Sequence, residues 1–333
     1  MRAMLLERTA PIETAPLRQA DIPPPEPGPG EVLVDVAACG CCRTDLHVIE
    51  GDLPEGRRPL VPGHQVVGRV VARGPGVASP AEGERVGVAW LAGTCGRCEH
   101  CREGAENLCL SPTFTGHHRD GGFAELVAAR ADWTYRLPDG LGDVEAAPLL
   151  CAGIIGYRAL RRCRVRPGQR LGIFGFGSSA HVTIQVARHE GVDVFVASLA
   201  ELHRRHARQL GAAWTGGADE LPPAELHAAI LFAPAGELVP VALRSLRRGG
   251  TLACAGIHVS TIPPLDYDAL LFQERTLTSV TANTRRDGEE LLRLAAEIPI
   301  RTSTTAYPLE RANEALADVK ASRVAGAAVL VTR

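Results

Sequence analysis

Four cysteines in a tight run have the clearest chemical meaning in this chain of 333 residues. Cys95, Cys98, Cys101 and Cys109 form the pattern C-x2-C-x2-C-x7-C, which suits a closed, tetrahedral Zn²⁺ site with a structural role. A bacterial iron–sulfur run needs a shorter last gap followed by Pro, whereas Leu110 follows here. Four buried thiols without a metal would need more apolar surroundings than this charged loop offers. We therefore predict a structural zinc ion.

A second set of potential metal ligands is spread widely along the chain. Cys42, His64 and Cys151 would form a Cys₂His set, which leaves one tetrahedral position open and is typical of a catalytic zinc site. Spacing alone leaves this assignment open. A single cysteine is often a small buried apolar residue, and a histidine after Pro62-Gly63 is also consistent with a simple turn residue.

A glycine-rich loop indicates a dinucleotide site. Gly175, Gly177 and Ala180 form G-x-G-x-x-A between an expected strand, 171–174, and a helix that starts at Ala180. The first glycine allows a tight turn, the second lets the main chain approach a pyrophosphate, and the small alanine lets the helix pack on the strand. The amino end of that helix would present N–H groups to the anion.

The end of the next strand bears on the choice of nicotinamide cofactor. An Asp or Glu there would bind the ribose 2′-hydroxyl of NAD, but the matching residue is Ser198, 23 positions after Gly175. Arg204 and Arg205 follow shortly. A neutral serine near two arginines favours NADP(H), while NAD(H), and a merely solvated face for the arginines, stay open.

The elements that must position these residues divide the chain into two kinds of structure. Short β-branched runs and Pro/Gly punctuation predict a twisted, mainly antiparallel β domain to about residue 150. Thereafter strands and helices alternate, which predicts a doubly wound parallel sheet. The expected strands are 170–174, 194–197, 229–232 and 251–255, with helices at 180–188, 203–210 and 238–246. A helix at 289–297 and a strand at 327–331 close the chain. The predicted domains are 1–151, with a zinc lobe at about 90–112, then 152–283, and finally 284–333.

Composition excludes several classes of partner. The chain has 36 Lys and Arg against 38 Asp and Glu, a formal net charge of −2, so we expect no binding to nucleic acid or to an anionic membrane surface. No apolar stretch approaches the ~18 residues that span a bilayer, and the first residues are too short a run for a signal-peptide core. We expect a cytoplasmic protein, in which ten cysteines serve as metal ligands or reduced thiols rather than disulfides.

Several motifs in a fixed order resemble the zinc-dependent alcohol dehydrogenases of the medium-chain dehydrogenase/reductase family over essentially the whole chain. They are the segments 38–47, 62–68, the four-cysteine run, 121–125 and 149–153. The resemblance implies a GroES-like catalytic domain, a Rossmann cofactor domain and a homodimer or homotetramer. It also implies reversible oxidation of a small alcohol to an aldehyde or ketone with NAD(P)⁺, and two zinc ions per chain, one catalytic and one structural.

The resemblance also implies roles for residues around the open metal site. Cys42, His64 and Cys151 would be the catalytic zinc ligands, and Asp45 would hydrogen-bond the far nitrogen of His64. Asp45 would also suit a helix amino terminus. Gln65 departs from the family, which usually has Glu after the ligand histidine. Because a glutamine adds no negative charge, we expect zinc to be a stronger Lewis acid beside Gln65 than beside the glutamate usual in the family.

Thr44 and His47 would form a proton relay in the family pattern. Thr44 would accept the proton of the substrate hydroxyl, and His47 would pass it towards solvent through the cofactor ribose. A helix cap and an exposed titratable residue are their alternative roles.

The remaining implied residues contact the cofactor or the substrate. Arg43 and Arg285 match pyrophosphate partners, Gly256 and Ile257 match the loop that meets the nicotinamide, and Trp90 and Leu91 match a wall of the substrate pocket.

Two other functions remain as alternatives. A polyol or sugar dehydrogenase of the same superfamily would often lack the four-cysteine lobe. A catalytically silent binding protein on this scaffold would be expected to lose catalytic ligands. The zinc content of the protein distinguishes these functions, because about two ions per chain are expected of the dehydrogenase, whereas about one would occupy only the four-cysteine lobe.

Overall fold

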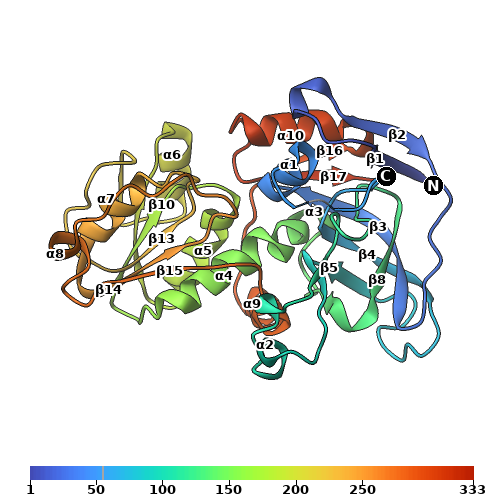
Figure 1. Ribbon diagram of the computed structural model, residues 1–333, viewed down its shortest axis with the longest axis horizontal. Helices are drawn as coiled ribbons and strands as arrows, with labels where there is room; N and C mark the ends of the chain where they lie inside the picture. Colours follow the sequence, from blue (N-terminus) through green and yellow to red (C-terminus); the bar gives the residue numbers. More distant parts are fainter. Residues whose placement is uncertain (55) are drawn as a thin grey trace. The chain divides into compact units, whose positions relative to one another are not determined.

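The computed structural model describes residues 1–54 and 56–333, which divide into two compact units. The first unit combines Met1–Cys151 with Ala282–Arg333, and the second is Ala152–Thr281 (Figure 1). Both ends of the chain belong to the first unit. Among the described residues, no helix is long and apolar enough to cross a membrane.

A seven-stranded sheet forms the centre of the first unit. Its neighbours pair antiparallel except for β16 with β17, which are parallel. Side chains of β3 alternate between buried and half-buried positions, with Val32, Val34 and Val36 in the core, as expected of a strand with one covered face. In spatial order the strands are β16 (Thr304–Pro308), β17 (Ala327–Val331), β3 (Glu31–Cys41), β4 (Gln65–Arg73), β5 (Arg85–Val88) and β9 (Thr134–Arg136), and β8 (Leu126–Arg130) also pairs with β3.

Smaller elements surround this sheet. Two additional strand pairs are β1 (Arg2–Leu6) with β2 (Leu17–Asp21) and β6 (Leu91–Gly93) with β7 (Thr113–Phe114). The α-helices are α1 (Arg43–Glu50), α2 (Glu99–Arg102), α3 (Asp143–Ala146), α9 (Arg285–Glu297) and α10 (Ala312–Lys320). The short 3₁₀ turns are η1 (Ile12–Thr14), η2 (Glu106–Leu108), η3 (Ala131–Trp133), η4 (Ala147–Leu150) and η5 (Leu309–Arg311).

The second unit is a six-stranded sheet in which every neighbouring pair is parallel. The strand order is β12 (Trp214–Gly216), β11 (Asp193–Ala197), β10 (Arg170–Phe174), β13 (Leu226–Leu231), β14 (Leu246–Cys254) and β15 (Thr276–Ser279). The helices of this unit are α4 (Ala152–Cys163), which precedes β10, and α5 (Ser178–His189), α6 (Glu201–Gln209), α7 (Leu238–Ser245) and α8 (Tyr267–Leu270), which lie between strands in the chain. The predicted fold class, an antiparallel β unit with a doubly wound parallel sheet, is confirmed.

Candidate active site

Strand pairing brings the three distant ligands together. In the antiparallel register of β3 and β4, Gly40 lies opposite Gln65. Cys42 therefore follows the end of one strand where His64 precedes the start of the other, and Cys151 follows η4. One ligand atom from each of Cys42, His64 and Cys151 lies within 4.8 Å of the others, and Cys42 Sγ is 3.4 Å from His64 Nε2.

This donor set fits a zinc ion. With ordinary Zn–S and Zn–N bond lengths, tetrahedral geometry separates a sulfur from a nitrogen by about 3.6 Å. The 3.4 Å between Cys42 Sγ and His64 Nε2 is close to that value. Two thiolates and an imidazole are ligands that zinc prefers, and three protein ligands leave a fourth position for a substrate oxygen.

Asp45 holds His64 in a defined orientation. His64 Nδ1 is 2.9 Å from Asp45 Oδ1, and both side chains are buried. Asp45 Oδ2 accepts a hydrogen bond from the main-chain N–H of Cys42, the residue that caps α1. One carboxylate thus satisfies the start of α1 and makes Nδ1 the protonated nitrogen of His64, which directs Nε2 towards Cys42.

Charges within the cluster are strongly coupled when no metal is bound. A hydrogen bond from Cys151 and the neighbouring His64 lower the pKa of Cys42 despite its burial. Burial alone would lower the pKa of His64, but Asp45 and Cys42 outweigh it and raise that pKa to about 10. Burial raises the pKa of Asp45, against the opposing effect of His64. The cluster therefore holds closely spaced groups that a divalent cation would neutralise.

The two expected relay residues lie on α1, directly after Cys42. Thr44 is buried, and its main-chain N–H donates to Cys42 Sγ over 3.3 Å. His47 lies near the other end of the helix, where its Nδ1 is 2.8 Å from Asp52 Oδ2. The sequence did not single out Asp52, although Gly51 before it signals the end of the helix.

An aromatic group covers one side of His64. The Trp90 ring meets the His64 ring edge to face with centroids 5.1 Å apart, and Phe114 stacks on Trp90 at 4.7 Å. The His117 ring is stacked near Trp90 with ring centroids 6.0 Å apart, and neither His117 nor Phe114 belongs to a motif that predicted this position. Leu91, the other expected wall residue, is fully buried in β6. Of the two expected wall residues, Trp90 is therefore the one that contacts a proposed zinc ligand, His64.

Gln65 is buried next to His64 and packs over Gly40. A Cβ atom at Gly40 would come within 2.9 Å of Gln65 Cδ, so only glycine leaves room for this side chain. Gln65 Nε2 is buried without a hydrogen-bond partner among the described residues. The neutral amide therefore lies beside the ligand cluster without an added charge.

The four-cysteine run is also assembled as a cluster. The ligand atoms of Cys95, Cys98, Cys101 and Cys109 lie within 4.8 Å of one another. Cys98 Sγ and Cys101 Sγ are 3.5 Å apart and Cys95 Sγ and Cys101 Sγ 4.0 Å apart, close to the about 3.8 Å expected between sulfurs around tetrahedral zinc. Main-chain N–H groups of Arg97 and Cys98 lower the pKa of Cys95 to about 6, which favours the thiolate that a metal needs.

Arg285 is engaged within the first unit. Glu106 binds its guanidinium and its main-chain N–H, and the guanidinium carbon lies 4.8 Å from the centre of the Trp133 ring. The pyrophosphate role that the resemblance implies for Arg285 stays a prediction, and a bound pyrophosphate would have to share or replace this contact with Glu106. Arg43 is exposed at the start of α1, where Nη2 is 3.4 Å from Ser322 Oγ.

The glycine-rich loop lies at the carboxyl end of β10, where strand order reverses between β11 and β13. Gly175 has φ of +89°, and a Cβ there would lie 2.7 Å from the main-chain nitrogen of Ala233. A Cβ at Gly177, the residue that caps α5, would meet no described atom within 4 Å. Ala180 is fully buried. The loop thus has the tight turn, open approach and close helix packing of a pyrophosphate site.

The ends of β11 and β14, two strands of the parallel sheet, carry the other expected cofactor residues. Ser198 follows β11 and is buried, and its carbonyl accepts a hydrogen bond from Arg204 Nη1. Arg205 is exposed. Gly256 and Ile257 follow β14, and Ile257 is exposed. Arg204 therefore orders the turn after β11 rather than simply lying on a solvated helix face.

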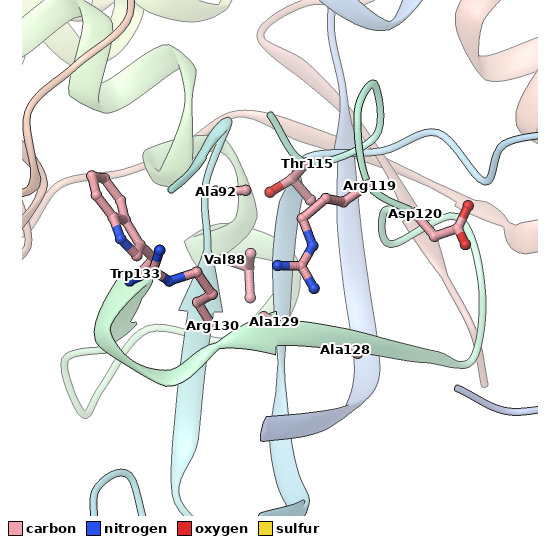
Figure 2. Close-up of a pocket in the computed structure, with 9 residues that line it drawn as sticks. All are labelled: Val88, Ala92, Thr115, Arg119, Asp120, Ala128, Ala129, Arg130 and Trp133. Atoms are coloured by element: carbon pink, nitrogen blue, oxygen red, sulfur yellow. The ribbon is translucent and has the colours of Figure 1, made fainter. Parts of the chain in front are cut away.

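A further small pocket lies in the first unit, and none of the sequence-predicted residues lines it. Its charged groups are already paired: Arg119 with Glu31, Asp120 with Arg57, and Arg130 with Asp132. Figure 2 shows the guanidinium groups of Arg119 and Arg130 on either side of Val88. The lining residues are Val88, Ala92, Thr115, Arg119, Asp120, Ala128, Ala129, Arg130 and Trp133.

Two family models match the chain. Residues 28–139 match the alcohol dehydrogenase GroES-like domain, and residues 180–297 match the zinc-binding dehydrogenase domain. The first range includes Cys42, His64 and the four-cysteine run, and the second begins at Ala180.

Individual proteins are similar over nearly the full length. A probable alcohol dehydrogenase AdhA of Mycobacterium tuberculosis (strain CDC 1551 / Oshkosh) is 51% identical over 336 residues, which covers 99% of this chain and 97% of the relative. The structure of acetophenone reductase from Geotrichum candidum with NAD has a TM-score of 0.88 at 27% identity, covering 99% and 96%. A putative zinc-binding dehydrogenase from Sinorhizobium meliloti 1021 bound to NADP has a TM-score of 0.86 at 27% identity, covering 99% and 98%.

Proposed function

Because this chain belongs to the zinc-dependent alcohol dehydrogenases of the medium-chain dehydrogenase/reductase family and catalyses reversible alcohol oxidation with NAD(P)⁺, we propose that Cys42, His64 and Cys151 hold its catalytic zinc. The convergence of these three residues on one point carries the proposal. The contact between Asp45 and His64 supports it, since metal-binding histidines usually donate their other N–H to a carboxylate or carbonyl.

The residues of α1 and their neighbours would perform the proton chemistry. When bound, zinc would supply Lewis acidity and nicotinamide a hydride acceptor, which leaves one proton to be removed for each alcohol oxidised. Thr44 takes the hydroxyl proton and His47 conveys it to solvent. Trp90 orients the substrate from beside His64. In the reverse direction the same groups return the proton to the carbonyl oxygen.

A second, structural zinc ion is part of the proposal. Cys95, Cys98, Cys101 and Cys109 offer a complete tetrahedral set, so this ion has no position left for a substrate. The lobe, at about 90–112, would be stabilised by the ion rather than take part in the reaction.

We infer a preference for NADP(H) over NAD(H). The turn after β11 holds the neutral Ser198 in place of a carboxylate that would repel a 2′-phosphate, and the exposed Arg205 lies on α6 directly after it. Gly175, Gly177 and Ala180 would bind the pyrophosphate, with Arg43 and Arg285 as partners, and Gly256 and Ile257 would meet the nicotinamide. The ratio of kcat/KM for NADPH and NADH tests this, and Arg205→Ala should reduce only the NADPH value.

We also propose that the protein forms a homodimer or homotetramer in the cytoplasm. A homodimer or homotetramer is supported by Tyr267 and Phe272, two exposed aromatic side chains with ring centroids 5.8 Å apart that shortly precede the edge strand β15 in the chain. All ten cysteines are free thiols, which suits the reducing cytoplasm. We propose that the Rossmann cofactor domain spans 152–283 and that 284–333 belongs to the catalytic domain. Light scattering on the zinc-replete protein would give the number of subunits.

The content of zinc and the activity of three serine variants test the metal assignments. Wild-type protein should contain about two zinc ions per chain. Cys151→Ser should lower the content to about one and abolish alcohol oxidation. Cys98→Ser should also lower the content to about one, with the catalytic ion retained. Cys254→Ser, outside both clusters, should leave the content unchanged. Two ions in the Cys151→Ser protein would contradict the catalytic assignment.

A further inference from the structure

The end of α1 folds an acidic side chain back onto His47. Gly51 ends the helix with φ of +86°, and the main-chain N–H groups of Gly51 and Asp52 both donate to the His47 carbonyl. This turn brings Asp52 Oδ2 to 2.8 Å from His47 Nδ1. The His47 side chain is 18% exposed and that of Asp52 is 52% exposed. The contact thus lies at the boundary between the protein interior and solvent.

We propose that Asp52 is a positioning residue for the proton relay, and this inference rests on the function proposed above. Because a carboxylate only accepts hydrogen bonds, it fixes the proton of neutral His47 on Nδ1 and places the lone pair on Nε2. In alcohol oxidation Nε2 accepts the proton that leaves the substrate, and the imidazolium then gives it to water. Asp52 itself neither takes nor gives the proton, and the nicotinamide, when bound, would supply the acceptor for the hydride.

The geometry favours this role over a purely structural contact. The backbone hydrogen bonds to the His47 carbonyl form the turn without help from the Asp52 carboxylate. The carboxylate therefore acts on the ring, where it sets the tautomer and the orientation of the imidazole. An asparagine at this position could instead donate to Nδ1 and select the other tautomer, with the proton on Nε2.

A mutant cycle between the two residues tests the proposal. Asp52→Asn should reduce kcat for alcohol oxidation by about tenfold with KM changed less than about twofold, in line with the loss of a partner that orients a functional histidine. Asp52→Glu keeps a carboxylate and should restore most of the rate. In the His47→Gln background, Asp52→Asn should have almost no further effect on kcat.

Glu7→Gln provides a matched control. It removes a carboxylate of similar exposure that pairs with Arg18, and it should leave kcat unchanged. Circular dichroism and thermal melting of all variants separate loss of fold from loss of the relay.

The results separate this inference from the proposed function. An unchanged kcat in Asp52→Asn, or an equal loss in the His47→Gln background, would overturn the role of Asp52 while leaving the relay intact. Full activity of His47→Gln alone would overturn the relay and the role of Asp52 together. Absence of alcohol oxidation in zinc-replete wild-type protein would instead refute the assigned activity.

Discussion

The carboxylate of Glu106 accepts hydrogen bonds from both the main chain and the side chain of Arg285. Glu106 Oε2 accepts the main-chain N–H of Arg285 over 2.9 Å, and Oε1 accepts Nε over 2.8 Å. Glu106 lies between the third and fourth cysteines of the metal lobe, while Arg285 is the first residue of α9. A short loop within the four-cysteine lobe is thereby joined to a helix almost 180 residues later in the chain.

Breaking this contact should destabilise the protein. Glu106→Ala leaves the amino end of α9 and a partly covered guanidinium without their partner, so the free energy of unfolding should fall by about 1–2 kcal/mol. Urea unfolding measures the change. Arg286→Ala is the control: its side chain is exposed and pairs with Glu290 within the helix, so it should cost less than about 0.5 kcal/mol. Equal losses in the two variants would contradict the role of Glu106.

Removing the carboxylate of Asp45 should weaken retention of the catalytic metal. Asp45→Asn removes the carboxylate that orients His64. Loss of such a partner lowers metal affinity by roughly 10- to 100-fold. The rate of zinc loss to a chelator should rise for one of the two ions. Asp35→Asn, which removes a carboxylate paired with Arg333, serves as the control and should release zinc at the wild-type rate.

Adding a charge at Gln65 should change the pH dependence of the reaction. Zn²⁺ with two thiolates and a neutral imidazole is formally neutral, so Asp45 supplies the nearby negative charge. Gln65→Glu would add another, which weakens the Lewis acidity of the metal and should move the alkaline-limb pKa of the rate upwards. Steady-state rates across pH measure this shift. Superimposable profiles for the two proteins would refute the expectation.

His181 should make the protein less stable in acid. It is fully buried in α5, neither ring nitrogen has a hydrogen-bond partner among the described residues, and burial lowers its pKa to about 4. The unfolded chain gains a proton at this residue below about pH 6.5, whereas the folded chain does so only near pH 4. Stability should therefore fall between these values, by up to about 3 kcal/mol from this residue.

Unfolding experiments at pH 7 and pH 4.5 test the contribution of His181. His181→Leu should lose less stability over this interval than wild type. His189→Leu changes an exposed histidine of the same helix and should retain the wild-type dependence. A loss in His181→Leu as large as that in wild type would rule out this histidine as the cause.

Sequence patterns predicted the regular core of the second unit well. The expected strand at 170–174 coincides with β10, because a buried parallel strand is a continuous apolar run that ends in glycine. The edge strands β12 and β15 were missed. Each is short, and β15 consists of Thr276–Ser279 with no buried residue, so neither has the apolar pattern that marks a strand. Helix α4 was also missed, because Gly153 and Gly156 interrupt its pattern.

Contacts that depend on long-range pairing were harder to predict. The resemblance brought Cys42, His64 and Cys151 together as a ligand set, but spacing alone did not, because their approach depends on the register of β3 and β4. The partners of His47 and Arg285 left no sequence signal of their own. Asp52 reaches His47 through a left-handed turn, and Glu106 reaches Arg285 across a folded domain.

The pairing of β17 with β3 has a consequence for biosynthesis. Leu330 lies opposite Cys39, so the sheet that positions Cys42 and His64, the first two proposed zinc ligands, is completed by a strand almost 300 residues later in the chain. A ribosome releases all of Ala152–Thr281 before β17 emerges. The parallel-sheet unit can thus fold on the nascent chain, while the sheet of the first unit is completed only once β17 has been synthesised.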